Sequence, residues 1–331
     1  MKNHELLTAI TGLTEYQKSK VVELVCMYEE LNAQLADTKP ALCPKCGKVH
    51  DGFWKRGFVG GKQRYQCKEC GKRFVYDCGR LTSHSQQSPE KWRIAIEDTI
   101  SLASLDKMAE HIGVCHTTAF YMRQKILICM EKAVKEMPEL DGLIEADETY
   151  LPESQKGVKV TGRKPRKHGE GASKRGLSGE QICICMATDR NNHVIAKSVN
   201  RAKASGEDIK AALEEKIAEK SVLQCDGADS YNALIQEKDC KKVELVGHES
   251  YDKIHHLNTV NGLHSKLKEM NRIYRGVSTK YLNRYLAMFA IREMLHEDTQ
   301  EEMMDRLLQK LRLVETNVVT ADLQSINLLQ V

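Results

Sequence analysis

Two acidic residues lie in positions from which they could bind divalent metal ions. Asp226 ends the apolar run Val222-Leu-Gln-Cys and is followed at once by Gly227. This pattern predicts a buried strand that delivers an acid to its own carboxyl edge, where a turn opens into a helix. Asp147 lies upstream in the β-rich run 143–150. The two acids therefore predict a site at one edge of a sheet.

A helix predicted downstream offers the remaining groups of this site. It spans about 257–271 and carries Asn261 and, two turns further along the same face, Lys268. Cleavage of a phosphodiester needs an activated oxygen nucleophile and relief of charge on the leaving oxygen. Two Mg²⁺ (or Mn²⁺) ions about 3.5–4 Å apart supply both, and such hard ions prefer oxygen ligands. We interpret Asp147, Asp226 and Asn261 as the catalytic metal ligands and Lys268 as a phosphate contact.

Each of these assignments has an alternative. Glu145 shares a strand face with Asp147, and Asp229 follows the same strand as Asp226. A mid-helix Asn such as Asn261 more often forms hydrogen bonds than binds metal. Three histidines near this helix are interpreted as DNA-contacting or core residues, since no matching His/Glu pair stands at helical spacing: His255, His256 and His264.

Four cysteines form a second metal site of a different kind. Cys43-Pro-Lys-Cys46 and Cys67-Lys-Glu-Cys70 each point two thiolates at one centre, which completes a tetrahedral zinc site with no open position. The segment between them predicts a β-hairpin with a Gly-Gly turn. The motif is that of a zinc ribbon with structural zinc. Its basic residues are predicted to contact DNA: Lys55, Arg56 and Arg64.

Positive charge is concentrated in two segments of a nearly neutral chain. The 331 residues carry a net charge of +4. Residues 41–76 hold nine Lys/Arg against two acids, and residues 153–180 hold eight against three. Such local patches indicate contacts with a polyanion. In the second segment, a Gly-rich loop, the predicted DNA contacts are Arg163, Lys164, Arg166 and Lys167.

Composition favours a cytoplasmic protein. No apolar run is long enough to span a membrane, and the N-terminus lacks the apolar core of a signal peptide. The eight cysteines outside the ribbon are scattered, several of them in apolar runs, as expected of buried thiols in a reducing compartment.

Residues 88–135 predict helices arranged as a helix-turn-helix. Ser88-Pro begins a helix, a second short helix ends at Gly113, and a third begins near His116. The last of these could lie in a DNA major groove. Its candidate DNA contacts are His116, Thr117, Thr118, Tyr121, Arg123 and Gln124.

From Leu143 onward, strands alternate with helices. Strands are predicted at 143–150, 181–189, 193–199, 222–226 and 243–247, and helices at 205–220, 228–237, 257–271 and 279–296. This is an RNase H-like order, and its crossovers imply parallel strands in the second half of the sheet.

The predicted fold is therefore a multidomain α/β chain. It has a helical segment (1–40), a zinc ribbon (41–80), a helix-turn-helix DNA-binding domain (85–138), an RNase H-like mixed-sheet catalytic domain (140–298) and a C-terminal helix and tail (299–331).

This combination of motifs resembles the IS1595 (ISXO2-like) insertion-sequence transposases. Besides the ribbon and the helix-turn-helix, the matching segments are Glu145-Ala-Asp-Glu-Thr-Tyr, Cys225-Asp-Gly-Ala-Asp-Ser-Tyr, His256-Leu-Asn-Thr-Val-Asn and 276–289. The resemblance covers roughly residues 40–295. It implies a DDE-type transposase in which the first two acids correspond to Asp147 and Asp226. Where much of the family has Glu, this chain has Asn261, which with Lys268 fits a D-D-N-K set.

The resemblance also implies partners and leaves alternatives open. A transposase would bind double-stranded DNA, both the terminal inverted repeats and the target, and would work as a homo-oligomer because two ends must be joined. A transposase-derived DNA-binding protein that no longer cuts is the alternative function. A structure-specific nuclease on the same fold is a third hypothesis.

Overall fold

The structure is a computed structural model that describes most of the chain from residue 43 to residue 295. The described residues are 43, 45–46, 52–59, 62–75, 81–82, 85–157, 165–166, 173, 176–227, 229–245, 252–295, 307 and 311. By its internal contacts the chain divides into two units, residues 1–79 and residues 80–331. None of the described helices combines the length and the apolar character that a membrane span requires.

The first unit contains a small antiparallel sheet. Strands β1 (Phe53–Val59) and β2 (Lys62–Cys67) form the predicted hairpin, and β3 (Arg73–Val75), which the sequence analysis missed, pairs with β2. Phe53, Tyr65 and Phe74 pack edge to face or tilted against one another beside the cysteines. Tyr65 is therefore a core residue of the ribbon.

Three helices begin the second unit. They are α3 (Pro89–Ile100), α4 (Leu105–Ile112) and α5 (His116–Lys135). Ser88 and Ser104 accept backbone hydrogen bonds as N-caps of α3 and α4, which satisfies amide groups that a helix start leaves unpaired. Gly113 ends α4 with a φ of 67°, a left-handed conformation that glycine adopts without steric cost. The helices thus form where the sequence predicted them.

A five-stranded mixed sheet forms the centre of this unit. Its strands are β4 (Leu143–Pro152), β5 (Gln181–Asp189), β6 (Val194–Arg201), β7 (Val222–Cys225) and β8 (Lys241–Glu244). The order is β6-β5-β4-β7-β8. The pairs β4–β5 and β5–β6 are antiparallel, and the pairs β4–β7 and β7–β8 are parallel. Numbered within the sheet, this is the 3-2-1-4-5 order expected of an RNase H-like fold.

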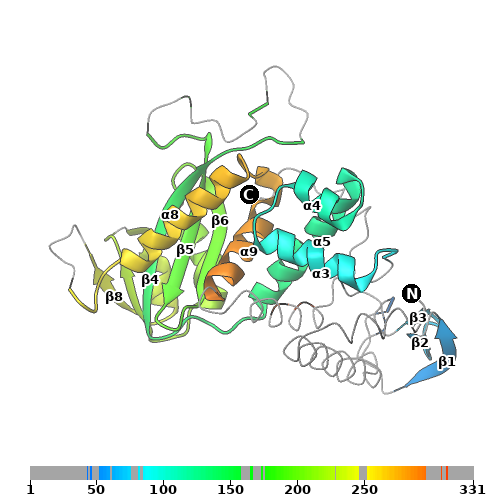
Figure 1. Ribbon diagram of the computed structural model, residues 1–331. Helices are drawn as coiled ribbons and strands as arrows, with labels where there is room; N and C mark the ends of the chain where they lie inside the picture. The colour runs from blue at the N-terminus through cyan, green and yellow to red at the C-terminus, as the bar shows by residue number, and fades with distance from the viewer. Residues whose placement is uncertain are drawn as a thin grey trace, which may run out of the picture. The chain divides into compact units, whose positions relative to one another are not determined.

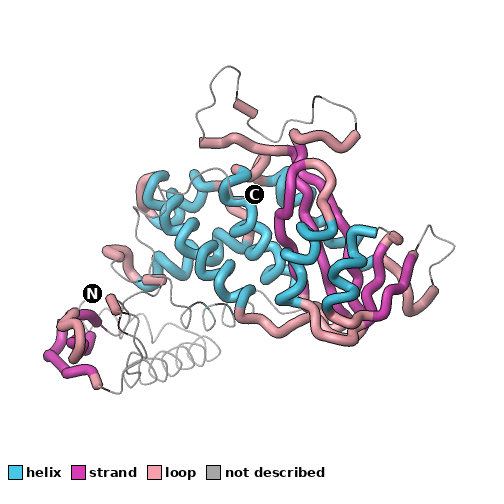
Figure 2. Tube along the Cα trace, turned by 180° about the vertical axis from the view of Figure 1, so that it is seen from behind, coloured by secondary structure: helices cyan, strands magenta, loops and turns pink. Residues whose placement is uncertain are grey.

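Helices cover both faces of the sheet (Figure 1). On one face, α6 (Gly206–Leu213) and α7 (Asn232–Glu237) pack over a core that includes Ile144 and Cys185. On the other face lie α8 (Asn258–Ile273) and α9 (Leu282–Met294). Helix α9 contacts both β6 and α5, and the view from behind also shows helices stacked beside the sheet (Figure 2). The helices α3–α5 therefore share one hydrophobic core with the sheet.

Several element boundaries differ from the prediction by a few residues, and two of the differences concern a helix end and an edge strand. The helix expected over 205–220 ends at Leu213 and continues only as a 3-10 turn, Glu214–Lys216, before Lys220 adopts a positive φ of 61°. The strand expected at 243–247 lies at Lys241–Glu244 instead.

Several predictions concern residues outside the described part of the chain. They are the leading helix, most of the basic loop with Arg163, Lys164 and Lys167, and the C-terminal helix and tail apart from Leu307 and Leu311, which are helical and buried.

Candidate functional site

The register of two parallel strands brings the two candidate acids together. In the β4–β7 pair, Glu145 lies opposite Gln224. Continuing this register by two residues places Asp226, just beyond the end of β7, beside Asp147. Neighbouring strands lie about 4.8 Å apart. The buried strand therefore delivers its acid to the carboxyl edge of the sheet, as the sequence predicted.

The pKa of Asp147 reflects the nearby charges of Asp226 and Lys268. The pKa of Asp147 is raised to about 6, chiefly because burial penalises the charged carboxylate. The charge of Asp226 raises it further, whereas the backbone N–H of Glu148 and the ammonium group of Lys268 lower it. Three of the four predicted residues thus lie within electrostatic reach of one another.

Glu145, the alternative to Asp147, has a different role. Its side chain is 1% exposed and faces the start of α8. Its Oε2 accepts hydrogen bonds from the backbone N–H groups of Thr259 (2.9 Å) and Val260 (3.1 Å). Its Oε1 accepts from Arg190 Nη1 at 2.6 Å. Because a helix start presents unpaired amides and a partial positive charge, Glu145 anchors α8 against β4.

The hydrogen bonds to Glu145 hold α8, the helix that carries Asn261 and Lys268, in position. Val260, Leu263 and Leu267 are buried against the sheet, while Asn261 and Lys268 are exposed. Residues at spacings of three and four share one helix face, so Asn261, His264 and Lys268 form one stripe along α8. His264 Nδ1 lies 3.8 Å from Asp147 Oδ2. The stripe therefore borders the acid pair.

His264 belongs to the site, although the sequence analysis assigned it no metal or catalytic role. Burial, and then the charge of Lys268, lower its pKa to about 4. The imidazole is consequently neutral at pH 7, and its contact with Asp147 is not an ion pair at that pH. Its Nε2 is buried without a hydrogen-bond partner among the described residues. Because the neutral ring does not compensate the negative charge of the acids, that charge is available to a bound cation.

Glu148 is a third carboxyl group at this edge, and the sequence analysis did not single it out. It lies on the opposite face of β4 from Asp147. Its pKa is raised to about 7 by burial and then by the charges of Asp147 and Asp226. The adjacent Asp-Glu pair at the predicted strand was the signal that could have identified it.

The donors present fit divalent cations. Asp147 and Asp226 lie side by side, and burial together with the charge of Asp226 penalises the ionised form of Asp147. A divalent ion offsets both effects and takes oxygen ligands from carboxylates and amides. Asp147, Asp226 and the amide oxygen of Asn261 are the groups suited to hold it. The charge of Lys268 lowers the pKa of Asp147. Asn261 is exposed, and only its position on α8 places it near the acids.

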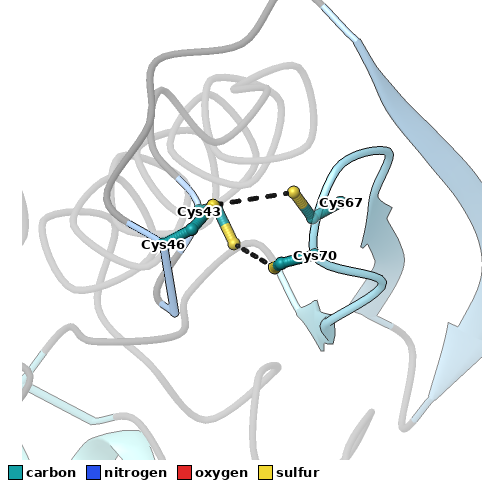
Figure 3. Close-up of side chains that lie close together, drawn as sticks. All are labelled: Cys43, Cys46, Cys67 and Cys70. Atoms are coloured by element: carbon teal, nitrogen blue, oxygen red, sulfur yellow. Dashed lines mark hydrogen bonds between the residues drawn. The ribbon is translucent and has the colours of Figure 1, made fainter.

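The four ribbon cysteines converge as the motif predicts (Figure 3). Their sulfur atoms all lie within 4.8 Å of one another, with Cys43 and Cys70 at 3.5 Å and Cys46 and Cys67 at 3.9 Å. Tetrahedral zinc with Zn–S bonds of about 2.3 Å requires sulfur atoms about 3.8 Å apart. The cluster therefore fits a closed zinc site.

The candidate DNA contacts differ in their exposure. Lys55 and Arg56 are exposed on β1, and Arg56 stacks 5.1 Å above the ring of the exposed Trp54. Arg64 is half-buried on β2 and donates to the carbonyl of Arg56. On α5, the described chain leaves His116 and Thr117 exposed and Thr118 and Tyr121 half-buried.

Three of the predicted contacts are buried and are corrected here. Arg123 is 1% exposed and donates to the carbonyl of Ala103 at 2.8 Å. Gln124 is fully buried and accepts from Arg284 of α9 at 2.7 Å. Arg166 is 8% exposed and forms an ion pair with Glu180. All three residues therefore have packing roles. For Arg123 and Gln124, helical spacing alone did not show that they lie on the buried side of α5.

The strand order and the acidic site define the class of protein: an RNase H-like α/β domain that carries paired acids beneath a helix. Residues 139–293 match the family model described as the ISXO2-like transposase domain. This part of the chain is similar to the ISXO2-like transposase family.

The chain is also similar to individual proteins. Over 290 residues the chain is 27% identical to an uncharacterized protein in transposable element ISH50 of Halobacterium salinarum, covering 84% of this chain and 94% of the relative. Among solved structures, a pre-cleavage Mos1 transpososome matches with a TM-score of 0.28 at 11% identity, covering 69% of this chain and 80% of that one. A simian T-cell lymphotropic virus intasome matches with a TM-score of 0.30 at 10% identity, covering 60% and 68%. The fold assignment rests on the strand order rather than on these two superpositions.

Proposed function

We propose that the chain is an active DNA transposase that cleaves and joins phosphodiesters at the ends of its insertion sequence. The observation that carries the proposal is the convergence of Asp147, Asp226 and Lys268 at the carboxyl edge of the sheet. The match of residues 139–293 to the ISXO2-like transposase domain supports DNA as the substrate class.

The chain's residues have distinct roles in this reaction. Asp147, Asp226 and Asn261 would hold Mg²⁺ or Mn²⁺ ions, which activate the attacking oxygen and stabilise the leaving oxygen. Lys268, exposed on α8, places a positive charge where a phosphate of the substrate would lie. Glu145 keeps α8 in position. With Asn in place of a third acid, the ligands carry two negative charges instead of three, which predicts weaker metal binding.

The remaining surfaces would bring DNA to this site. The ribbon, through Lys55, Arg56 and Arg64, and the exposed start of α5, through His116, Thr117 and Thr118, are proposed to bind the terminal repeats. Arg163, Lys164 and Lys167 of the basic loop remain proposed backbone contacts. Joining of two ends further implies a homo-oligomer on DNA.

Mn²⁺-dependent nicking of a labelled duplex that contains the element's ends tests this proposal. The wild type would be compared with Asp226→Ala, Asn261→Ala and a matched control, Asp229→Ala, which removes an equally exposed acid three residues from Asp226. We expect sequence-specific nicking that is lost at least 100-fold in the first two variants and retained in the control.

The other outcomes separate the alternatives. Loss with Asp226→Ala but not Asn261→Ala would keep the enzyme and remove Asn261 from the metal site. Tight binding to the ends without nicking under Mg²⁺ or Mn²⁺ would favour a transposase-derived DNA-binding protein. Nicking that ignores the end sequence would favour a general nuclease.

A further inference from the structure

A cleft lies in the second unit between the helices α4 and α5 and the segment that joins α8 to α9. Its volume is about 1250 Å³. One wall is formed by residues of 98–124 and the other by residues of 273–285, with Lys156 and Gly157 at one end. The acid pair described above does not line it.

The charges of this cleft suit an anion. Among the described residues that line it, five are Lys or Arg and one is an acid, Asp98. That acid is already paired with His111 Nδ1 at 3.0 Å. Lys107 and Arg275 are exposed and Lys280 is half-buried. The cleft therefore offers a concentrated positive potential to a ligand.

Aromatic rings form much of its apolar surface. The lining includes Phe120 and Tyr121 from α5 and Tyr274, Tyr281 and Tyr285 from the opposite wall. Phe120 lies 5.6 Å from Tyr121 and 5.9 Å from Tyr281, measured between ring centroids. Rings combined with Lys and Arg are the chemistry by which proteins bind unpaired nucleotides, because the bases stack and the phosphates are neutralised. A base inside a duplex keeps its faces stacked on its neighbours and cannot reach such rings.

Buried donors in the lining residues point to the same ligand. Arg123 Nε, Gln124 Nε2 and the hydroxyl of Tyr274 are buried without a hydrogen-bond partner among the described residues. All three can donate a hydrogen bond, so each of them requires an acceptor. Leaving such groups unpaired is costly. A nucleotide supplies acceptors through its base edge and its phosphate oxygens.

Part of the wall formed by residues 273–285 has an unusual backbone conformation. Arg275 has a φ of 49° and Gly276 a φ of 78°. The ammonium group of Lys156 donates to the carbonyls of Tyr274 (2.8 Å) and Gly276 (2.6 Å), which fixes this turn. A non-glycine residue in the left-handed region is maintained only where its surroundings enforce it. The fixed turn places Arg275 among the residues that line the cleft.

We propose that this cleft binds an unpaired nucleotide of a DNA strand, with its base against the aromatic rings and its phosphates near Lys107, Arg275 and Lys280. The inference depends on the proposed function only in taking DNA as the ligand. It adds a second DNA site, which lies apart from the acid pair. This site would take single-stranded DNA, such as a strand end that has separated from its complement.

Fluorescence anisotropy with the full-length protein tests the site. The probes are labelled oligothymidylate and a labelled blunt duplex, with unlabelled thymidine monophosphate as a competitor. Tyr121→Ala should weaken binding of the single strand about tenfold, the effect of losing one stacked base, and change duplex binding less than twofold. Tyr121→Phe retains the ring and should restore single-strand binding.

Charge variants provide an independent measurement. Lys107→Ala and Lys280→Ala should each lower the salt dependence of single-strand binding by about one phosphate contact. Lys203→Ala removes an exposed lysine outside the cleft and should leave it unchanged. Because Lys107 is exposed and Lys280 is half-buried, their alanine variants should fold. They therefore test the site even if Tyr121→Ala fails to fold.

Three results would overturn the inference. Equal losses of single-strand and duplex binding in Tyr121→Ala would make Tyr121 an ordinary groove contact. Competition by thymidine monophosphate as effective as by the oligonucleotide would make the cleft a mononucleotide site. Wild-type protein that nicks element ends without binding oligothymidylate would disprove this site alone, whereas single-strand binding without nicking would disprove only the proposed function.

Discussion

Asp147 and Glu148 place two partly buried carboxyl groups on opposite faces of one strand, both within reach of the charge of Asp226. Ionising these acids without a counter-ion costs free energy, which appears as pKa values raised to about 6 and about 7. The site that could bind metal is therefore a source of instability in the metal-free protein.

The first prediction concerns the pH dependence of stability. The pKa of Asp147 is higher in the folded than in the unfolded chain, so its stabilising effect is complete below pH 4 and is lost as the pH rises through about 6. Asp147→Asn should therefore raise the free energy of unfolding of metal-free protein by about 1–3 kcal/mol at pH 8 and have little effect at pH 4. Urea denaturation at both pH values measures the difference.

Metal ions provide the control for this prediction. Mn²⁺ should stabilise the wild type at pH 8 and leave Asp147→Asn almost unaffected, because binding to the folded state alone adds stability. An equal effect of Mn²⁺ on both proteins would show that Asp147 is not a ligand. Asp147→Asn should also abolish nicking.

Sequence patterns identified some of these residues and missed others for physical reasons. Asp147 and Asp226 were predictable because strand ends have a local pattern. The choice between Asp147 and Glu145 was not, since Glu145 contacts Thr259, which lies 114 residues further along the chain. His264 was missed because its role depends on burial beside Asp147, which helical spacing does not reveal.

At the scale of elements, α8 depends on an anchor that comes from the sheet. Glu145 accepts from two backbone amides at the start of this helix and from Arg190. Because the carboxylate is buried, no water could replace it as an acceptor if it were removed. Arg190 would then keep only its hydrogen bonds to Ile254 and Thr259 among the described residues. The helix that presents Asn261 and Lys268 is thereby tied to the strand that presents Asp147.

The second prediction follows from this anchor. Glu145→Ala should lower the free energy of unfolding by about 2–4 kcal/mol, as expected when buried charge-assisted hydrogen bonds are lost. The exposed Glu215→Ala control should change it by less than about 0.5 kcal/mol. Thermal denaturation with both variants measures the effect. A Glu145→Ala protein as stable as the wild type would mean that α8 is held by its apolar face alone.

The elements themselves were largely predictable. The strands and helices after Leu143 follow clear periodic patterns, and the strands of the second half of the sheet pair in parallel, as the crossovers predicted. The exceptions are short or depend on distant contacts. Strand β3 has three residues, too few to show a period, and the early end of α6 depends on a turn that places Lys220 at positive φ.

At the scale of the whole molecule, the two metal sites belong to different units. The cysteine cluster lies in residues 1–79 and the acid pair in residues 80–331. Each unit has its own core, and among the described residues of the ribbon this core consists of three aromatic rings and the cysteines. A core this small rarely holds a fold without a disulfide or a metal. The ribbon should therefore depend on zinc, whereas the larger unit should not.

The third prediction separates these dependences in the full-length protein. Cys43→Ser should lower the zinc content measured by mass spectrometry of the native protein, because three thiolates and a hydroxyl bind zinc more weakly than four thiolates. Binding to the element's ends should weaken at least tenfold by anisotropy. The main unfolding transition should persist, and so should Mn²⁺-dependent nicking of the element's ends at protein concentrations high enough to saturate that duplex. Cys115→Ser, which changes an exposed cysteine outside the cluster, should leave all of these unchanged. If Cys43→Ser instead abolished nicking of every duplex while zinc remained bound, the ribbon would contribute to the chemistry rather than to recognition.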